Sequence, residues 1–287
     1  MSSSTTGDKK SDWSPDQYIL FKQARGRAID DLIAYLGRSL PTPPSRIVDL
    51  GCGPGNSTQS LITHFPSAVV SGIDSSPAML ETARAALPGV EFSLADVSSY
   101  SPPPAAAAAE GPTLLFSNAV FHWLPSRARI PTVSRLLRSL SPGSVLALQV
   151  PDNFDEPSHR AMRETAYSPR FAKYFEGGGP DEKAELDPIE PAERWHDELV
   201  GDCRHLEIWR TEYQHVMGDH GEIVEWVRST GLMPFLWRIP GEEEKAVFLD
   251  EYRKRLEDAE GGGYKTLGDG RKVMLTYPRL FVVAFRG

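Results

Sequence analysis

The sequence has few cysteines, no long apolar run and no excess of positive charge. Its two cysteines, Cys52 and Cys203, offer neither a disulfide framework nor the spacing of metal ligands, so no metal is expected. Apolar runs stay well short of the roughly 18 residues of a membrane span, and the polar start predicts a cytoplasmic protein. A net charge of -8 argues against a general nucleic-acid or membrane-surface binder. We therefore expect a small-molecule substrate.

The most informative segment is a glycine-rich loop after a short apolar stretch. Ile47 to Leu50 predicts a buried strand, and glycines at positions 51, 53 and 55 let the backbone turn sharply and approach a ligand. Asn56 stands where the dinucleotide fingerprint G-x-G-x-x-G has its last glycine. Asp49 before the loop would repel a pyrophosphate but suits the cationic end of S-adenosylmethionine. The charges thus favour S-adenosylmethionine over a dinucleotide, and a purely structural turn is the remaining alternative.

Strand and helix patterns alternate up to about residue 150. Strands are expected over 47–50, 69–74, 90–94, 114–117 and 145–150, and helices over 16–36, after the glycine loop, over 76–86 and over 129–140. Asn56 or Ser57 is expected to cap the helix after the loop, and Ser76 followed by Pro77 marks the next helix start. This alternation predicts an open parallel sheet with right-handed crossovers and helices on both faces.

Polar residues follow four of the expected strands. Asp49 lies at the end of the first strand, and Asp74, Asp96 and Asn118 come at or just after the ends of the next three. Ligands of such sheets bind at the carboxyl ends of the strands, so one ligand can meet all four positions. An acid at the position of Asp74 can accept both hydroxyls of a ribose. Each acid could alternatively serve only as a loop cap.

The regular alternation ends after Val150. Residues 151–271 are mostly helical in pattern, except that Leu206 to Tyr213 alternates like a strand, and Leu280 to Phe285 predicts a final strand. We expect these two strands to pair antiparallel at the sheet edge, with the helices forming a cap over the cofactor. The expected organisation is a disordered tail over 1–10, a cofactor-binding α/β core with an N-terminal helical segment over 11–150, and a helical substrate cap with closing strands over 151–287.

Short sequence blocks spread over most of the chain match a known family. They lie at 13–18, 49–58, 72–80, 118 with 123–125, 151–153, 162–164, 208–211, 226–232 and 278–281. By these blocks the chain resembles the trans-aconitate methyltransferase family of the class I S-adenosylmethionine-dependent superfamily. The resemblance implies a Rossmann-like fold, S-adenosylmethionine as cofactor, and methylation of a carboxylate of trans-aconitate to a monomethyl ester. The loop at 101–112, the glycines near 177 and His122 depart from the family pattern, which leaves the exact acid open.

Two sets of residues form the candidate site. Contacts to the cofactor are expected from Asp49, Gly51, Gly53, Gly55, Asn56, Asp74, Ser75, Asp96, Val97 and Asn118. A tricarboxylate substrate needs cationic and hydroxyl donors, and arginine suits a carboxylate because it can donate two parallel bonds. The expected substrate contacts are Tyr18, His122, Trp123, Arg163, Arg210, Tyr213, Tyr277 and Arg279, with Arg279 and Arg210 ranked first.

The chemistry implied by the resemblance needs no general base. A carboxylate is already ionised at neutral pH, so the protein only has to hold nucleophile, methyl carbon and sulfur in line. His122 is then expected to be a pocket wall or hydrogen-bond donor, and the arginines could alternatively form ordinary surface ion pairs. A methyltransferase for another small acid or secondary metabolite, and a non-catalytic S-adenosylmethionine-binding protein, remain alternatives. A monomer is expected.

Overall fold

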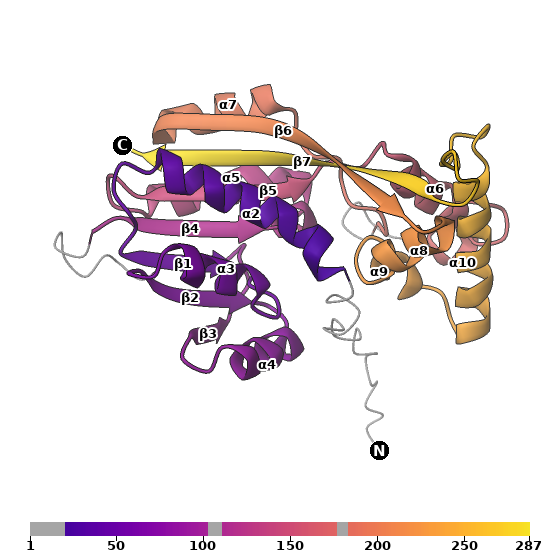
Figure 1. Cartoon of the computed structure of the whole chain (residues 1–287), viewed down its shortest axis with the longest axis horizontal. Helices are drawn as coiled ribbons and strands as arrows, with labels where there is room; N and C mark the ends of the chain where they lie inside the picture. Colours follow the sequence, from indigo (N-terminus) through magenta and orange to yellow (C-terminus); the bar gives the residue numbers. More distant parts are fainter. Residues whose placement is uncertain (1–20, 103–110, 177–182) are drawn as a thin grey trace, which may run out of the picture.

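A seven-stranded sheet forms the centre of the molecule (Figure 1). The computed structural model describes residues 21–102, 111–176 and 183–287; the tail expected over 1–10, Tyr18 and most of the loop at 101–112 lie outside these ranges. The strand order is β3-β2-β1-β4-β5-β7-β6. The strands are β1 (Arg46–Leu50), β2 (Val69–Asp74), β3 (Glu91–Leu94), β4 (Thr113–Asn118), β5 (Val145–Pro151), β6 (Cys203–Met217) and β7 (Val273–Arg286).

The first five strands are parallel, and β7 runs antiparallel to both of its neighbours, β5 and β6. The consecutive parallel pairs β1–β2, β2–β3 and β4–β5 are each joined through a crossover helix, as the alternation of strand and helix patterns predicted. The expected fold class, a mostly parallel sheet closed by an antiparallel strand, is confirmed. Because β1 and β4 are central neighbours, the loops that follow them meet at the carboxyl edge of the sheet.

Helices cover both faces of the sheet. On one face, α2 (Lys22–Ser39) and α3 (Asn56–His64) pack on residues of β1, β4, β5 and β7, and Ile29, Leu32, Ile33 and Leu36 of α2 are buried there. On the other face lie α5 (Ser126–Arg138) and α7 (Ala192–Leu199). The helix α4 (Pro77–Ala86) packs beside β2 and β3. The helix α7 was expected in the cap, but its buried Trp195 and Leu199 make it part of the core.

The remaining helices form a second apolar cluster beyond the sheet edge, at the right of Figure 1. They are α6 (Pro157–Ala166), α8 (His220–Arg228), α9 (Met233–Leu236) and α10 (Glu242–Glu257), with the 3-10 turn η2 (Ala172–Tyr174). The buried side chains Trp226 and Phe248 are part of this cluster. The 3-10 turns η1 (Phe121–Trp123) and η3 (Val200–Asp202) contact the core instead, where Phe121 is buried. Among the described residues, no helix combines the length and apolar character needed to cross a membrane.

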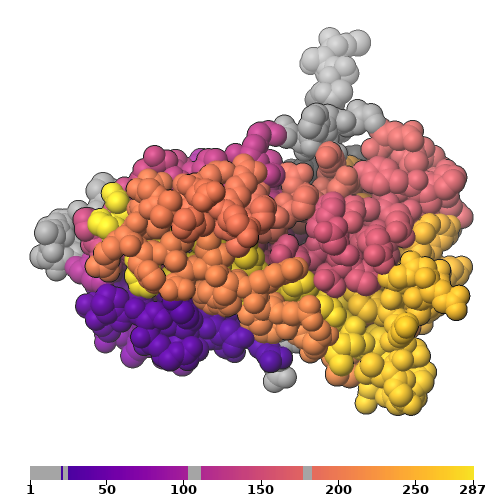
Figure 2. Space-filling view, turned by 90° about the horizontal axis from the view of Figure 1, so that it is seen from above, coloured from indigo at the N-terminus to yellow at the C-terminus, as the bar shows by residue number. Residues whose placement is uncertain are grey.

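The long ribbon of β6 and β7 connects the two clusters. Both strands were expected and both are longer than expected: β7 pairs with β5 only from Arg279 to Phe285, while its first residues pair with β6 alone. Val273, Leu275 and Tyr277 therefore belong to the cap cluster, whereas Leu280 and its successors belong to the core. In Figure 2, the orange segment that contains β6 lies along this face, between the indigo α2 and the pink and yellow cap.

Candidate functional site

A cavity of about 480 Å³ lies at the carboxyl ends of the parallel strands, between the sheet edge and the cap. On the sheet side it is lined by Gly51, Gly53, Asp74, Ser75, Asp96, Val97 and Asn118. On the other side it is lined by His122, Trp123, Trp226, Tyr277 and Arg279, among others. A second hollow of about 470 Å³ adjoins the glycine loop and includes Asn56. Residues expected for cofactor and for substrate thus meet around one space.

The glycine loop needs glycine for three different reasons. Gly51, Gly53 and Gly55 all have left-handed φ values, of 72°, 54° and 92°. A Cβ on Gly53 would meet nothing within 4 Å, so this residue leaves space beside the cavity it lines. A Cβ on Gly51 would lie 2.2 Å from Val120 Cγ2, so this glycine makes room for a neighbouring loop rather than for a ligand. Gly55 caps α3, and the cap expected from Asn56 or Ser57 is wrong.

Asp74 is fixed at the cavity wall by backbone donors. The amide of Gly53 donates to Oδ2 of Asp74 over 2.8 Å, and the amide of Ser76 donates to Oδ1 over 2.8 Å. Ser76 caps α4 as expected, accepting a bond from the amide of Met79. A carboxylate on the cavity wall can accept bonds from the two hydroxyls of a diol. The loop and the carboxylate therefore hold each other in place at the site where a ribose can bind.

The next strand ends add further polar groups. Asp96 is exposed, and its Oδ1 accepts bonds from the amide and the hydroxyl of Ser98 at 2.8 and 2.6 Å. Val97 beside it is buried and gives the cavity an apolar wall. Asn118, at the end of β4, accepts a bond from the side-chain amide of Gln149 on β5. Its place beside Gly51 and Gly53 brings the ends of β1 and β4 together.

Asp49 lies beneath the loop and does not line the cavity. It is fully buried, and its Oδ2 accepts bonds from the hydroxyls of Ser57 and Thr58, each over 2.7 Å. Within the described structure its Oδ1 has no hydrogen-bond partner. Burial raises the pKa of Asp49 to about 6, the two hydroxyls oppose this rise, and the nearby charge of Asp74 adds to it. The expected direct contact with the cofactor is not supported by this position; Asp49 anchors the first turn of α3.

Arg279 is the cation of the opposite wall that is most enclosed. Only 7% of the residue is exposed, and its Nη1 donates to Oε1 of Gln149 over 3.1 Å. The guanidinium also lies 4.8 Å from the ring centroid of Tyr277, within the range of a cation–π contact. Because Gln149 in turn donates to Asn118, a chain of side chains ties Arg279 to the cofactor side of the cavity.

His122 and Trp123 follow β4 on η1 and line the same cavity. His122 is buried, and burial, followed by the charges of Arg279 and Arg129, lowers its pKa well below 6.5. The imidazole is therefore neutral at pH 7 and adds no charge to the site. This agrees with a role as a wall or hydrogen-bond group and does not favour a titrating acid or base.

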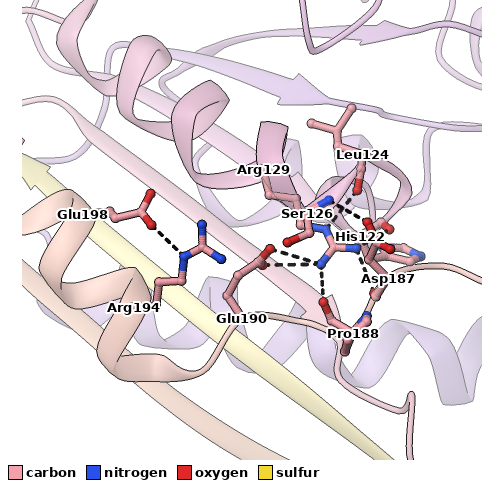
Figure 3. Close-up of polar contacts among 9 residues, drawn as sticks. All are labelled: His122, Leu124, Ser126, Arg129, Asp187, Pro188, Glu190, Arg194 and Glu198. Carbon is pink, nitrogen blue, oxygen red and sulfur yellow. Dashed lines mark hydrogen bonds and ion pairs between the residues drawn. The ribbon is translucent and has the colours of Figure 1, made fainter. Parts of the chain in front are cut away.

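A buried arginine that the sequence did not single out holds this wall in place (Figure 3). Arg129 of α5 is fully buried; it donates to the carbonyl oxygens of Leu124, Pro188 and Asp187 over 3.0, 2.6 and 2.8 Å. It also forms an ion pair with Glu190 over 3.4 Å. The only signal in the sequence is a charge on the apolar side of a helix. Arg129 thus joins the His122 loop to the segment that precedes α7.

Several expected substrate residues do not reach the main cavity. The side chain of Arg210 is 57% exposed and its Nε lies 3.0 Å from Oδ2 of Asp152, so it forms a surface ion pair. Tyr213 packs under α2, where its hydroxyl donates to Asp31 over 2.6 Å. Arg163 lines a smaller neighbouring cavity. Tyr18 lies outside the described residues, and Gly55 lines neither of the two large hollows.

Other lining residues were missed at the level of sequence. They are Arg25 of α2, Lys183, Leu186, Trp226, Thr230 and Trp237. Trp226 and Thr230 belong to a block that carried the family resemblance, so a signal for them existed. Arg25 and Lys183 lie in segments without a recognisable motif, and only the packing of the cap beside the sheet brings them to this wall.

Comparisons with known proteins agree with this geometry. Residues 47–143 match the model of a methyltransferase domain. A trans-aconitate 2-methyltransferase of Methylobacterium nodulans is 44% identical over 96% of this chain and 98% of the relative, and one of Rhizobium etli is 43% identical over 96% and 99%. The chain belongs to the trans-aconitate 2-methyltransferase family. It is therefore an S-adenosylmethionine-dependent methyltransferase.

The fold also has relatives of low sequence identity. The YcgJ protein of Bacillus subtilis superposes with a TM-score of 0.54 at 12% identity, covering 90% of this chain and 98% of that protein. At this level of identity the likeness concerns the fold alone.

The sheet side of the cavity fits S-adenosylmethionine. Its volume lies within the roughly 300 to 1,000 Å³ of small-molecule sites, and Gly53 leaves the loop side open. Asp74 is suited to the ribose hydroxyls, and Asp96 and Val97 lie further along the same edge. When bound, the cofactor supplies a methyl group activated by the sulfonium charge.

Asp74 provides a direct test of this placement. Replacing Asp74 with alanine should weaken the binding of S-adenosylhomocysteine by roughly 1.5 to 3 kcal/mol, the range for lost hydrogen bonds to a charged group. Calorimetric titration measures the change, with Asp250→Ala on the exposed side of α10 as the matched control. Equal affinities of the wild type and the Asp74 variant would place the ribose elsewhere.

The buried carboxyl of Asp49 predicts a pH-dependent stability. Its folded-state pKa of about 6, against 3.8 for a free carboxyl, means that the folded protein holds this proton more tightly. The free energy of unfolding should therefore fall between about pH 4 and 6 and stay lower above that range. Asp49→Asn cannot ionise, so it should be more stable than wild type by up to roughly 3 kcal/mol above pH 6 and lose this advantage near pH 4. Urea denaturation across this range tests it; an advantage that does not vary with pH would point to packing instead.

Proposed function

We propose that this chain transfers the methyl group of S-adenosylmethionine to a carboxylate of trans-aconitate. The relatives of similar length bear the name of this activity. The structural observation that carries the proposal is the buried guanidinium of Arg279 on the cavity wall opposite Asp74 and the glycine loop. A methyltransferase for a different metabolite or a non-catalytic binder is not favoured. A monomer, a cytoplasmic location and the lack of a nucleic-acid partner stay predictions from the sequence.

The cavity is lined by both acidic and basic side chains. Among the described residues that line it, the carboxylates are Asp74 and Asp96 on the sheet side, and the cations are Arg25, Lys183 and Arg279. Arg25 donates to the carbonyl oxygen of Trp226, and its guanidinium lies 5.3 Å from the centroid of the Trp226 ring. Three cations suit a substrate with several carboxylates, since a desolvated anion needs charged donors.

The residues that line the cavity can position the substrate carboxylate relative to the methyl group of the cofactor. An ionised carboxylate needs no proton removed, and the low pKa of His122 leaves that residue neutral. Hydrogen bonds from Arg279 to Gln149 and from Gln149 to Asn118 fix the guanidinium that is proposed to bind the substrate relative to the cofactor side of the cavity. Trp123, Trp226 and Trp237 add large apolar surfaces to the wall. Such positioning can contribute roughly 7 to 11 kcal/mol to catalysis.

Arg279 should be required for the acid but not for the cofactor. Arg279→Ala should lower kcat/KM for trans-aconitate by an amount worth roughly 2 to 5 kcal/mol, because a carboxylate would remain unpaired in a buried site. Arg279→Lys should restore little, since an ammonium cannot make two parallel bonds. Initial rates with labelled methyl donor measure both effects, and titration with S-adenosylhomocysteine should show unchanged cofactor affinity.

Arg210→Ala serves as the matched control. It removes an arginine from the neighbouring strand, but this guanidinium is exposed and paired with Asp152. The variant should retain the activity of the wild type. If Arg210→Ala and Arg279→Ala lost activity to the same degree, the buried position of Arg279 would not explain substrate binding.

The pH profile tests the chemistry. With an ionised nucleophile and a neutral His122, kcat/KM should be nearly flat from about pH 6.5 upward. His122→Ala should keep the same profile even if its overall rate is lower. A steep rise near pH 7 in the wild type that disappears in the variant would instead show a titrating catalytic histidine.

A further inference from the structure

A smaller polar hollow adjoins the main cavity. It has a volume of about 40 Å³ and shares His122, Pro151 and Leu186 with the walls of the main cavity. We call it the side pocket; its polar walls are His122, Asn153, His159, Arg163, Glu185 and Asp187. One water needs roughly 10 to 15 Å³ of such volume, so the volume of the side pocket corresponds to about three waters. It is therefore large enough for one carboxylate group but too small for a whole tricarboxylate.

Two walls of the side pocket carry buried polar atoms without a partner. Asn153 is 8% exposed and His122 is 9% exposed. In the described part of the chain, Nδ2 of Asn153 and Nδ1 of His122 have no hydrogen-bond partner. Leaving such a group unpaired costs roughly 1 to 3 kcal/mol, so these atoms require an explanation. The Asn153 Nδ2 is a donor, which indicates that the missing partner is an acceptor.

Arg163 adds a positive charge to the same pocket. Its guanidinium stacks 3.7 Å from the centroid of the Phe154 ring, and its Nη1 donates to the Phe154 carbonyl over 2.7 Å. Within residues 21–102, 111–176 and 183–287, it forms no ion pair closer than 4.0 Å. Burial and Arg163 lower the pKa of His159 to about 3, so this wall is neutral. The pocket thus offers one cation and neutral donors, beside the carboxylates of Glu185 and Asp187.

The acids on the wall of the side pocket have other partners. Oε2 of Glu185 accepts a bond from the hydroxyl of Tyr167 over 2.7 Å. Oδ2 of Asp187 accepts a bond from the amide of Ser126 over 2.9 Å. Neither forms an ion pair with Arg163, which remains the cation of this pocket.

We propose that the side pocket receives one spectator carboxylate of the substrate, bound by Asn153 and Arg163, while Arg279 holds another in the main cavity. This assignment rests on the proposed function. It makes the side pocket the determinant that separates a tricarboxylate from dicarboxylates. Gly231 provides the steric limit, because a Cβ there would lie 3.0 Å from Nε2 of His159 and 3.3 Å from Cε of Met162.

Three dicarboxylates identify which carboxylate enters the pocket. Mesaconate replaces the carboxymethyl arm of trans-aconitate with a methyl group, cis-glutaconate lacks the carboxylate on the branched carbon, and itaconate lacks the carboxylate on the unbranched alkene carbon. Asn153→Asp is nearly isosteric but places a negative charge against the substrate, and Arg163→Ala removes the cation. Each variant should lower kcat/KM for trans-aconitate roughly 10- to 100-fold, the loss expected for a charged hydrogen bond. For the dicarboxylate that lacks the pocket carboxylate, the loss should stay within about twofold.

A substitution that changes no charge tests the role of the side pocket by its size. Gly231→Ala should narrow the side pocket and lower turnover of trans-aconitate more than that of the same dicarboxylate. Arg170→Ala, which removes an exposed arginine paired with Glu244, is the control and should leave the rates with all four acids unchanged. Titration with S-adenosylhomocysteine should give the wild-type affinity for every variant, which shows that the cofactor side is intact.

The possible failures are distinct. If the wild type methylates trans-aconitate but the side-pocket variants lose activity equally on all four acids, or lose none, the pocket does not bind a substrate carboxylate and the assignment is wrong. If the wild type methylates none of the acids while binding the cofactor, the proposed function fails, and the assignment fails with it.

Discussion

The pairing of β7 with β6 along its whole length is the constraint on which the site depends. One end of β7 is a strand of the core sheet beside β5, and the other end is buried in the cap cluster. The cap is thus joined to the core by continuous backbone hydrogen bonds rather than by a linker. Arg279 pairs with Pro151 where β5 ends, so the arginine proposed to bind the substrate lies at the junction of the core and the cap.

Burial controls the charges of this site. It raises the pKa of Asp49 beneath the loop, and it lowers the pKa of His122 and of His159 on the walls. Each shift favours the uncharged form, as expected when ionisable groups leave water. The arginines keep their charge, because guanidinium is a much stronger base. On the cavity wall opposite the glycine loop, His122 is therefore neutral while Arg279 keeps its positive charge, although the whole chain has a net charge of -8.

The two hollows share a wall that is itself held by a residue distant from the ligands. His122 lies between the main cavity and the side pocket, and Arg129 fixes both its loop and the segment before α7 (Figure 3). Removing a partner of such a buried arginine would destabilise the protein, because its charge would be left without compensation. The shape of the acceptor site thus depends on an interaction in the core, which couples the packing of α5 to the position of the wall.

The sequence by itself determined the sheet, the glycine loop and the strand-end residues Asp74, Asp96 and Asn118, because these follow from local periodicity and from the common edge of parallel strands. It did not determine which arginine faces the cavity. Register places Arg210 opposite Leu280, one residue from Arg279, so the two side chains lie on opposite faces of the sheet. The contact of Gly51 with Val120, the burial of Asp49 and the side pocket were likewise decided by tertiary structure. Each joins residues that are far apart in the chain, and no local pattern encodes such packing.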